Sequence, residues 1–250
     1  PTAFSLLVAE HRRLLLTPDR LADSGSVLLK TEEQHYLRRV LRLRCGDRVD
    51  VIDGCGRLSV ATLLESNLIE IDPTALHIEA PPQPQLGLAV ALMRRGMDEV
   101  IRMACELGID RIQPIRCERC LPQAEHRPER WASIVREAVE QCERLWMPQL
   151  LAVEELSQWM GDDQGQRLVG VTREIEPPAL NQWLIQKGDP LELTWLVIGP
   201  EGGWTAAEKS LITEARVHPI QMGSTILRSS TAAVAGAVEL VRWRDGLISS

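Results

Sequence analysis

The spacing of apolar residues changes once along the chain, at the proline-rich stretch "PPQPQ" over residues 81–85. This change limits the possible folds more than any other feature of the sequence. Before that stretch, apolar and polar residues alternate over short segments. The segment "GDRVDVIDGCGRLSVATLLE" (46–65) predicts a β-hairpin with its turn at 53–56. After it, short apolar runs alternate with segments of helical spacing, which predicts an α/β domain with a mostly parallel sheet. We therefore expect a small β-domain over 1–80 and an α/β domain over 83–250.

Five apolar runs mark the expected strands of the α/β domain: 86–93, 109–115, 167–172, 193–199 and 218–223. Helices are expected between and after them, over 97–107, 131–142, 179–187, 206–215 and 231–242. Ligands of parallel sheets bind where loops leave the carboxyl ends of the strands. The loops after Ile198 and after Met222 both carry glycine, so we expect the ligand there. The last helix is rich in alanine and glycine, which favours close packing.

The stretch "LVIGPEGGWTAAE" (196–208) is the most informative of these strand ends. Thr205 and Glu208 have the spacing of a capping box, which predicts a helix from Ala206. A plain turn needs fewer than three glycines, and glycines at a strand end let the backbone approach a ligand closely. Glu201 stands among them, either as a functional carboxylate or as a favourable charge near a helix N-terminus.

Composition and charge narrow the class of protein. With 250 residues, 44% apolar and 25% charged, the chain is typical of a globular protein of one or two domains, and no apolar run reaches the roughly 18 residues of a membrane span. Six scattered cysteines indicate reduced thiols and a cytoplasmic location. A net charge of −7 argues mildly against nucleic acid, but the basic segment "YLRRVLRLRCGDR" (36–48) could still meet phosphates.

Several motifs occur together and in a characteristic order. They are "HYLRRVLRLRCGDRVDVIDGCG" (35–56), "RRGMDEVIRMACELGIDRIQPIRCERC" (94–120), "RPERWASIVREAVEQCERLWMP" (127–148), "IGPEGGW" (198–204) and "MGSTILRSSTAAVAGAVEL" (222–240). With them, nearly the whole chain resembles the RsmE-type 16S rRNA uridine-N3 methyltransferases of the SPOUT superfamily. The resemblance implies a PUA-like β-barrel followed by a trefoil-knotted α/β methyltransferase domain. It also implies S-adenosylmethionine as cofactor, 16S rRNA of the small ribosomal subunit as substrate, and a homodimer.

The reaction that the resemblance implies assigns roles to residues of this sequence. Methyl transfer to uridine N3 needs loops around the cofactor, removal of a weakly acidic proton, and a cation near the charge that develops. Arg228 and Glu201 are the expected catalytic residues. The residues expected to hold the cofactor are Thr172, Ile198, Gly199, Pro200, Gly202, Gly203, Met222, Gly223, Ile226, Leu227, Ser229, Thr231 and Ala232. Those expected to contact RNA are Arg38, Arg39, Arg42, Arg94 and Arg95. Trp204 is expected to border the site.

One departure from the family pattern keeps other functions open. Relatives usually read "LRTETA" where this chain reads "LRSSTA" (227–232), so Ser230 replaces a glutamate. An RNA-binding or ribosome-assembly protein that keeps the fold without catalysis is one alternative, and a ribose 2′-O methyltransferase is another. Cys117 and Cys120 with His126 suggest zinc, but a structural zinc site needs four ligands and no second pair follows, so we expect no metal. We also expect no membrane partner.

Overall fold

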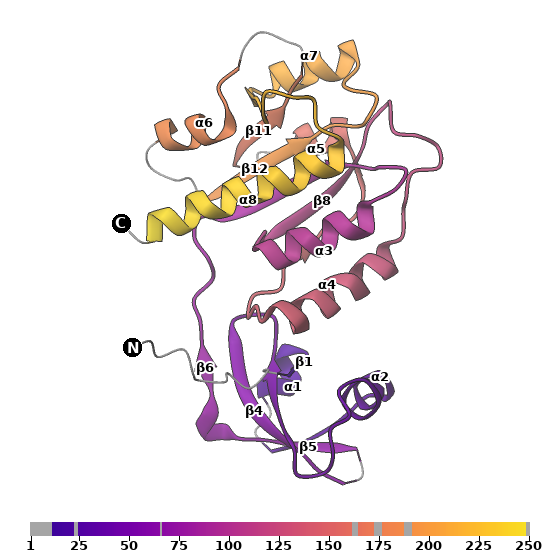
Figure 1. Cartoon of the computed structure of the whole chain (residues 1–250), viewed down its shortest axis with the longest axis vertical. Coiled ribbons are helices and arrows are strands. Elements are labelled where there is room, and N and C mark those ends of the chain that lie inside the picture. The colour runs from indigo at the N-terminus through magenta and orange to yellow at the C-terminus, as the bar shows by residue number, and fades with distance from the viewer. Residues whose placement is uncertain are drawn as a thin grey trace, which may run out of the picture. The chain divides into compact units, whose positions relative to one another are not determined.

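The computed structural model describes residues 12–22, 25–65, 67–161, 165–172, 177–187 and 192–248 (Figure 1). The chain forms two compact units. Unit 1 comprises Pro1–Pro81 together with Arg136–Met147, and unit 2 comprises Pro82–Val135 and Pro148–Ser250. The passage between them near residue 81 lies at the proline-rich stretch. Residues 136–147 fall within the sequence-predicted C-terminal domain, yet they pack with the N-terminal unit.

Unit 1 is built around a six-stranded sheet. Its strands are β1 (Arg13–Leu15), β2 (Ser26–Leu28), β3 (Arg48–Ile52), β4 (Arg57–Leu63), β5 (Leu68–Ile71) and β6 (His77–Ile78). Their order is β1-β3-β4-β5-β2, with β6 beside β4. β3 and β4 pair antiparallel with Val51 opposite Ser59, which confirms the predicted hairpin. Alternate residues of these strands, among them Val49, Leu63 and Ile69, enter one buried core.

Short helical segments complete unit 1. They are α1 (Pro18–Ala22), α2 (Thr31–His35), the π-helical turn η1 (Tyr36–Val40) and the 3-10 turn η2 (Pro73–Ala75). None of them was expected from the sequence, because each is shorter than the windows over which helical periodicity becomes legible.

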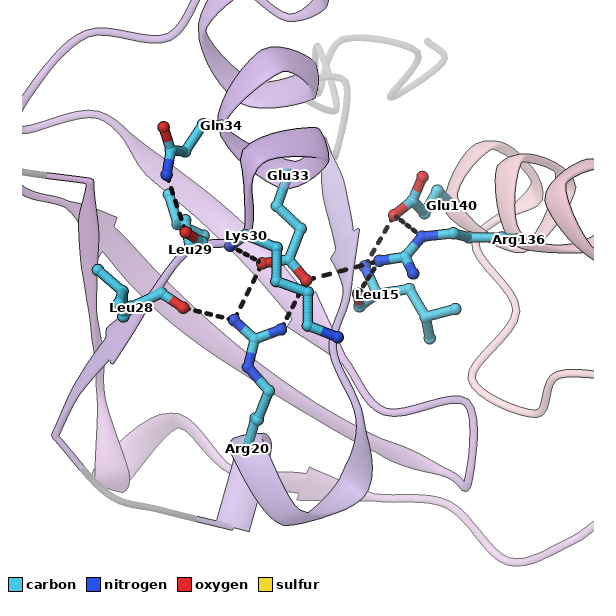
Figure 2. A network of polar contacts seen from close by, with 9 residues as sticks. All are labelled: Leu15, Arg20, Leu28, Leu29, Lys30, Glu33, Gln34, Arg136 and Glu140. Carbon is cyan, nitrogen blue, oxygen red and sulfur yellow. Dashed lines mark hydrogen bonds and ion pairs between the residues drawn. The ribbon is translucent and has the colours of Figure 1, made fainter.

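A network of buried polar groups explains why residues 136–147 belong to unit 1 (Figure 2). Arg20 and Glu33 form an ion pair of 2.6 Å. The Leu15 N–H donates to Glu140 at 2.9 Å, and Arg136 donates to the Leu15 carbonyl at 2.6 Å. Arg136 also lies 3.8 Å from both carboxylates, Glu33 and Glu140. The last turns of α4 (Pro128–Cys142) therefore bind strand β1 and helix α2 directly.

Unit 2 contains a seven-stranded sheet. Its strands are β7 (Gln85–Ala91), β8 (Arg111–Arg116), β9 (Gln149–Leu150), β10 (Glu154–Glu155), β11 (Gln166–Gly170), β12 (Leu193–Ile198) and β13 (His218–Ile220). The order is β10-β8-β7-β12-β11-β13, with β9 beside β8. The ladders between these strands are all parallel, as the sequence predicted. All five predicted strands are present.

Helices lie on both faces of this sheet (Figure 1). The helices that belong wholly to this unit are α3 (Met97–Leu107), α5 (Leu156–Gly161), α6 (Leu180–Lys187), α7 (Ala206–Glu214) and α8 (Ser229–Ile248). α3 ends at Gly108 in a left-handed conformation, as expected, whereas α8 is longer at both ends than the predicted 231–242. Among the described helices, none is both long and apolar enough to cross a membrane.

The two faces of the sheet are packed by alternate residues of its strands. Trp195 and Val197 point to the side that holds α5 and α7, where Trp159 meets Trp195 edge to face at 5.4 Å. Leu196 points to the side of α8. A Cβ on Gly236 of α8 would lie 2.1 Å from Leu196 Cδ2, so only glycine permits this approach. The small-residue helix does pack closely on the sheet.

Candidate active site

The strand order brings three loops to one place. β12, β11 and β13 are neighbours and parallel, so their carboxyl ends meet at one edge of the sheet. A pocket of about 650 Å³ lies there. Its walls come from the segments that follow β11, β12 and β13, with the first turn of α8. This is the position at which the sequence predicted a ligand.

The loop after β12 is held in a tight turn. The Gly203 N–H donates to the Pro200 carbonyl at 2.8 Å. A Cβ on Gly199 would lie 2.7 Å from the ring of Trp204, which is buried beneath the loop. Glycine at 199 therefore lets the backbone pass between the tryptophan and the pocket. This close approach explains the first of the three glycines.

The capping box at the start of α7 shows whether Glu201 serves the N-terminus of that helix. The Glu208 N–H donates to the Thr205 hydroxyl at 3.2 Å, and the Thr205 N–H donates to the Glu208 carboxylate at 2.8 Å. Glu208 is thus the carboxylate that serves this helix end. Glu201 is exposed and lies on the pocket wall instead. A helix-capping role does not account for it.

The loop after β13 is fastened to its two neighbours. The Gln221 N–H donates to the Pro178 carbonyl at 2.9 Å, and the Leu180 N–H donates to the Gln221 carbonyl at 3.1 Å. At the other end of the loop, the Ser229 hydroxyl donates to the Gly199 carbonyl at 2.8 Å. Hydrogen bonds therefore join the segments that follow all three strands.

Among the described residues, three cationic side chains and one carboxylate line the pocket. Arg228 lies at the start of α8, Lys209 on α7, and Arg119 in the loop after β8, while Glu201 is the carboxylate. Arg119 Nη1 donates to the Gly202 carbonyl at 2.9 Å. Sequence reasoning missed Arg119 and Lys209. Arg119 could have been noticed, because it follows the strand predicted over 109–115 and loops after neighbouring parallel strands share an edge.

The pocket brings together most of the residues expected at the site. Those that line it are Thr172, Ile198, Gly199, Pro200, Glu201, Gly203, Trp204, Met222, Gly223, Ile226, Leu227, Arg228, Ser229 and Ala232. Gly202 and Thr231 do not line it. Ser230 does not line it either, because its Cβ faces Gly96 at the start of α3, 3.8 Å from where a Cβ of that glycine would stand.

The arginines expected to contact RNA lie outside the pocket. In unit 1, Arg39 and Arg42 are exposed, whereas Arg38 is half-buried and donates to the Leu64 carbonyl at 3.2 Å. Arg38 therefore has a structural partner of its own. In unit 2, Arg94 and Arg95 are exposed in the loop between β7 and α3.

The residues of the pocket fit an adenosine-containing cofactor. Ligand pockets span roughly 300–1,000 Å³ and combine apolar walls with a few polar groups. Here Ile198, Met222 and Leu227 supply apolar surface, and Gly199, Gly203 and Gly223 bring the backbone to the pocket. Among the described residues no cluster of three or more histidine, cysteine or acidic side chains could hold a metal ion.

Two families match the chain. The family described as RNA methyltransferase domain matches residues 80–240, and the family described as RNA methyltransferase PUA domain matches residues 29–72. Ribosomal RNA small subunit methyltransferase E of Synechocystis is 36% identical over 235 residues, which cover 91% of this chain and 76% of that protein. The protein of the same name from Mycobacterium bovis is 27% identical, covering 92% of this chain and 93% of the relative.

Solved structures give the same fold. Ribosomal RNA small subunit methyltransferase E of Neisseria gonorrhoeae, bound to S-adenosylmethionine, is 27% identical with a TM-score of 0.74, covering 92% of this chain and 96% of that one. A protein from Legionella pneumophila, also solved with S-adenosylmethionine, has a TM-score of 0.79 at 23% identity, covering 92% of this chain and 96% of its own. The chain therefore shares its fold with these two proteins over most of its length.

Proposed function

Because the chain belongs to the ribosomal RNA small subunit methyltransferase E family, we propose that it transfers the methyl group of S-adenosylmethionine to N3 of a specific uridine in 16S rRNA. One observation carries this proposal. The pocket at the carboxyl ends of β11, β12 and β13 is lined by Gly199, Gly203 and Gly223 and also by Arg228 and Glu201. A cofactor site and charged groups suited to proton removal are therefore adjacent.

The loops of the pocket bind and orient the cofactor. When bound, S-adenosylmethionine supplies an electrophilic methyl group on a sulfonium centre. Main-chain groups near Gly199 and Gly223 would meet polar atoms of the adenosine, and Ile198, Met222 and Leu227 would enclose its base. The hydrogen bonds that join the three loops hold these groups in place. Positioning of this kind removes part of the entropic barrier to transfer.

Glu201 and Arg228 would handle the proton and the charge of the uracil ring. N3 of uridine becomes nucleophilic when its proton leaves, and the negative charge then spreads onto the flanking carbonyl oxygens. The Glu201 carboxylate can accept that proton, since it is exposed on the pocket wall. The Arg228 guanidinium is a cationic donor that can stabilise the anion.

The position of Ser230 disfavours a protein without catalysis. That alternative depended on the loss of a family glutamate at 230, yet residue 230 does not line the pocket. Its neighbour is Gly96, so a side chain there acts on the start of α3. The match to a PUA domain over 29–72 also favours the rRNA base-methylating family over a ribose 2′-O methyltransferase.

Finer parts of the proposal concern topology, assembly and location. After β13 the chain pairs with Ala179 through Gln221 and then passes to α8 beside Gly199, a path that supports the family's trefoil knot. The homodimer follows from the family resemblance. None of the six cysteines, all of which lie in the described part of the chain, is in a disulfide, which supports a reducing cytoplasm.

The test is methylation of purified small ribosomal subunits taken from a strain that lacks the corresponding enzyme. The protein is incubated with radiolabelled S-adenosylmethionine, and the RNA is digested and mapped by mass. We expect one methylated uridine in 16S rRNA whose methyl group resides on N3. Large subunits from the same strain serve as the control substrate. A methyl group on a ribose, or no transfer by a protein that binds the cofactor, would overturn the proposal.

A further inference from the structure

Two cysteines lie in the loop after β8, and the proposed methyl transfer makes no use of their thiols. The Cys120 N–H donates to the Cys117 carbonyl at 3.0 Å, which closes a β-turn. The Cys117 N–H donates to the Cys120 sulfur at 3.3 Å. A β-turn keeps its end Cα atoms within about 7 Å, and a disulfide spans about 4.4–6.8 Å. The pair can therefore be bridged with small backbone movement.

The two thiols have unequal environments. Cys120 is half-buried and Cys117 is 5% exposed. The interaction with the Cys117 thiol lowers the pKa of Cys120 to about 7 against the effect of burial, and Arg116 adds to the lowering. The same interaction and burial, with Glu208 and Glu155 nearby, raise the pKa of Cys117. One sulfur thus carries thiolate character at the surface while the other stays protonated behind it.

The two residues between the cysteines form hydrogen bonds to residues at and near the pocket. Arg119 lines the pocket and donates to the Gly202 carbonyl at 2.9 Å. The Glu118 N–H donates to the buried Glu208 carboxylate at 2.9 Å, and Glu208 belongs to the capping box of α7. Any change in the shape of the cysteine turn is therefore transmitted to the glycine loop through Arg119 and to the first turn of α7 through Glu118.

We propose that Cys117 and Cys120 form a redox-sensitive dithiol, oxidised to a disulfide by a hydroperoxide, that controls the placement of Arg119 at the pocket. The Cys120 thiolate attacks one peroxide oxygen, the O–O bond breaks, and the departing oxygen takes up a proton. The Cys117 sulfur then attacks the Cys120 sulfenic acid, and the hydroxyl leaves as water with the Cys117 proton. With hydrogen peroxide, two thiols yield one disulfide and two waters.

The disulfide changes the pocket through geometry. It brings the two Cβ atoms to about 3.8 Å, which reshapes the turn on which Arg119 is carried. The bond from Arg119 to the Gly202 carbonyl is then lost. A hydrogen bond from a charged donor contributes about 1.5 kcal/mol, so we expect cofactor affinity to fall about tenfold on oxidation. The inference rests on the proposed function only in its use of S-adenosylmethionine as the binding probe. The formation of the disulfide does not depend on that function.

The sequence makes the oxidation easy to detect. Trypsin cleaves after Arg116, Arg119 and Arg130 but not between Arg127 and Pro128, so the two cysteines fall in separate peptides, 117–119 and 120–130. The purified full-length protein is treated with hydrogen peroxide, alkylated and digested without reductant. We expect a linked pair of these peptides, two hydrogens lighter than their sum, that disappears after reduction. Cys120 recovered as sulfinic acid with no linked pair would overturn the proposal.

The functional arm measures S-adenosylmethionine binding by calorimetry before oxidation, after oxidation and after re-reduction. The wild type should lose about tenfold in affinity reversibly. Cys120→Ser should not respond, whereas Cys45→Ser, which removes an exposed thiol of unit 1, should respond as the wild type does. An unchanged affinity in protein that carries the linked peptides would refute control of the pocket. Were Cys120→Ser not to fold, reversal by reductant in the wild type would decide. Both measurements, the linked peptides and the calorimetric affinity, can also be made on a protein that methylates no rRNA, so failure of the proposed function and failure of this inference are distinguishable.

Discussion

The hydroxyl of Ser229 donates a hydrogen bond to the carbonyl oxygen of Gly199 at 2.8 Å, across 30 residues of sequence. Ser229 is buried, and it is the first residue of α8. This single bond joins the glycine loop after β12 to the helix that closes the pocket.

Replacing Ser229 with alanine should loosen that junction. The variant leaves the Gly199 carbonyl without its donor, which costs about 0.5–1.5 kcal/mol. We expect S-adenosylmethionine affinity to fall about 2- to 10-fold by calorimetry, with the far-UV circular dichroism spectrum unchanged. Ser210→Ala is the matched control, since the Ser210 hydroxyl bonds only within its own helix. Equal affinities for the two variants would argue against a role for the junction in binding.

Arg228→Ala should reduce turnover far more than binding. If the guanidinium stabilises the charge on the uracil ring, its loss should lower the single-turnover rate by about 10²-fold, similar to removal of one oxyanion donor. Cofactor affinity should change little, because main-chain and apolar groups supply most of that site. Arg242→Ala, an exposed arginine further along α8, controls for net charge. A wild-type rate for Arg228→Ala would remove Arg228 from the catalytic assignment.

Glu201→Gln tests the general base. We expect the chemical step to slow by about 10²–10⁴-fold. Raising the pH should restore part of the rate, because hydroxide can then remove the N3 proton without the carboxylate. Glu214→Gln, at the exposed end of α7, should keep both the rate and its pH profile. A full-rate Glu201→Gln enzyme with an unaltered profile would show that the carboxylate only lines the pocket.

Arg39 and Arg42 should act on RNA binding alone. Both are exposed in unit 1, whereas Arg38 already donates to a carbonyl. The double alanine variant should bind rRNA more weakly and reduce the slope of log affinity against log salt by about one for each lost phosphate contact. A double variant of Arg102 and Arg216 removes the same charge elsewhere. The prediction fails if both double variants show the wild-type slope.

The Arg20–Glu33 ion pair should make the free energy of unfolding depend on pH in the acidic range. Burial raises the pKa of Glu33, but hydrogen bonds from Arg20 and the Lys30 N–H outweigh it and lower that pKa below its ordinary value of 4.5. A lowered folded-state pKa stabilises the protein above the ordinary pKa, and this stabilisation is lost as the pH falls through the folded value. Glu33→Gln should therefore flatten the acid limb of the unfolding free energy, measured by urea titration across pH.

Two variants sharpen that measurement. Glu32 is exposed on the same helix, so Glu32→Gln should leave the unfolding free energy at acidic pH as it is in the wild type. Arg20→Met leaves the Glu33 carboxylate buried without its main partner and should cost about 1–3 kcal/mol, between the values for exposed and buried pairs. Burial raises the pKa of Glu140, so its contribution has the opposite sign. Identical acid limbs for Glu33→Gln and Glu32→Gln would contradict the assignment.

The amino-acid pattern alone predicted five strands and five helices of unit 2 and the edge at which its pocket lies, but not the short elements β9, β10 and α5. Apolar period reports burial within a segment, and parallel strands must place their carboxyl ends together, so the loops after Ile198 and Met222 could be paired in advance. The Thr205–Glu208 capping box was legible for the same reason, since its geometry spans a single turn.

The tertiary structure decided everything that joins residues far apart in the chain. The attachment of residues 136–147 to unit 1 depends on Arg136 and Glu140 meeting β1 and α2. The bond from Arg119 to Gly202 and the remote position of Ser230 depend likewise on which elements pack together. A local pattern shows which side chains are buried or exposed but not which distant partner each one meets, because that choice is made by the packing of the whole sheet and its helices.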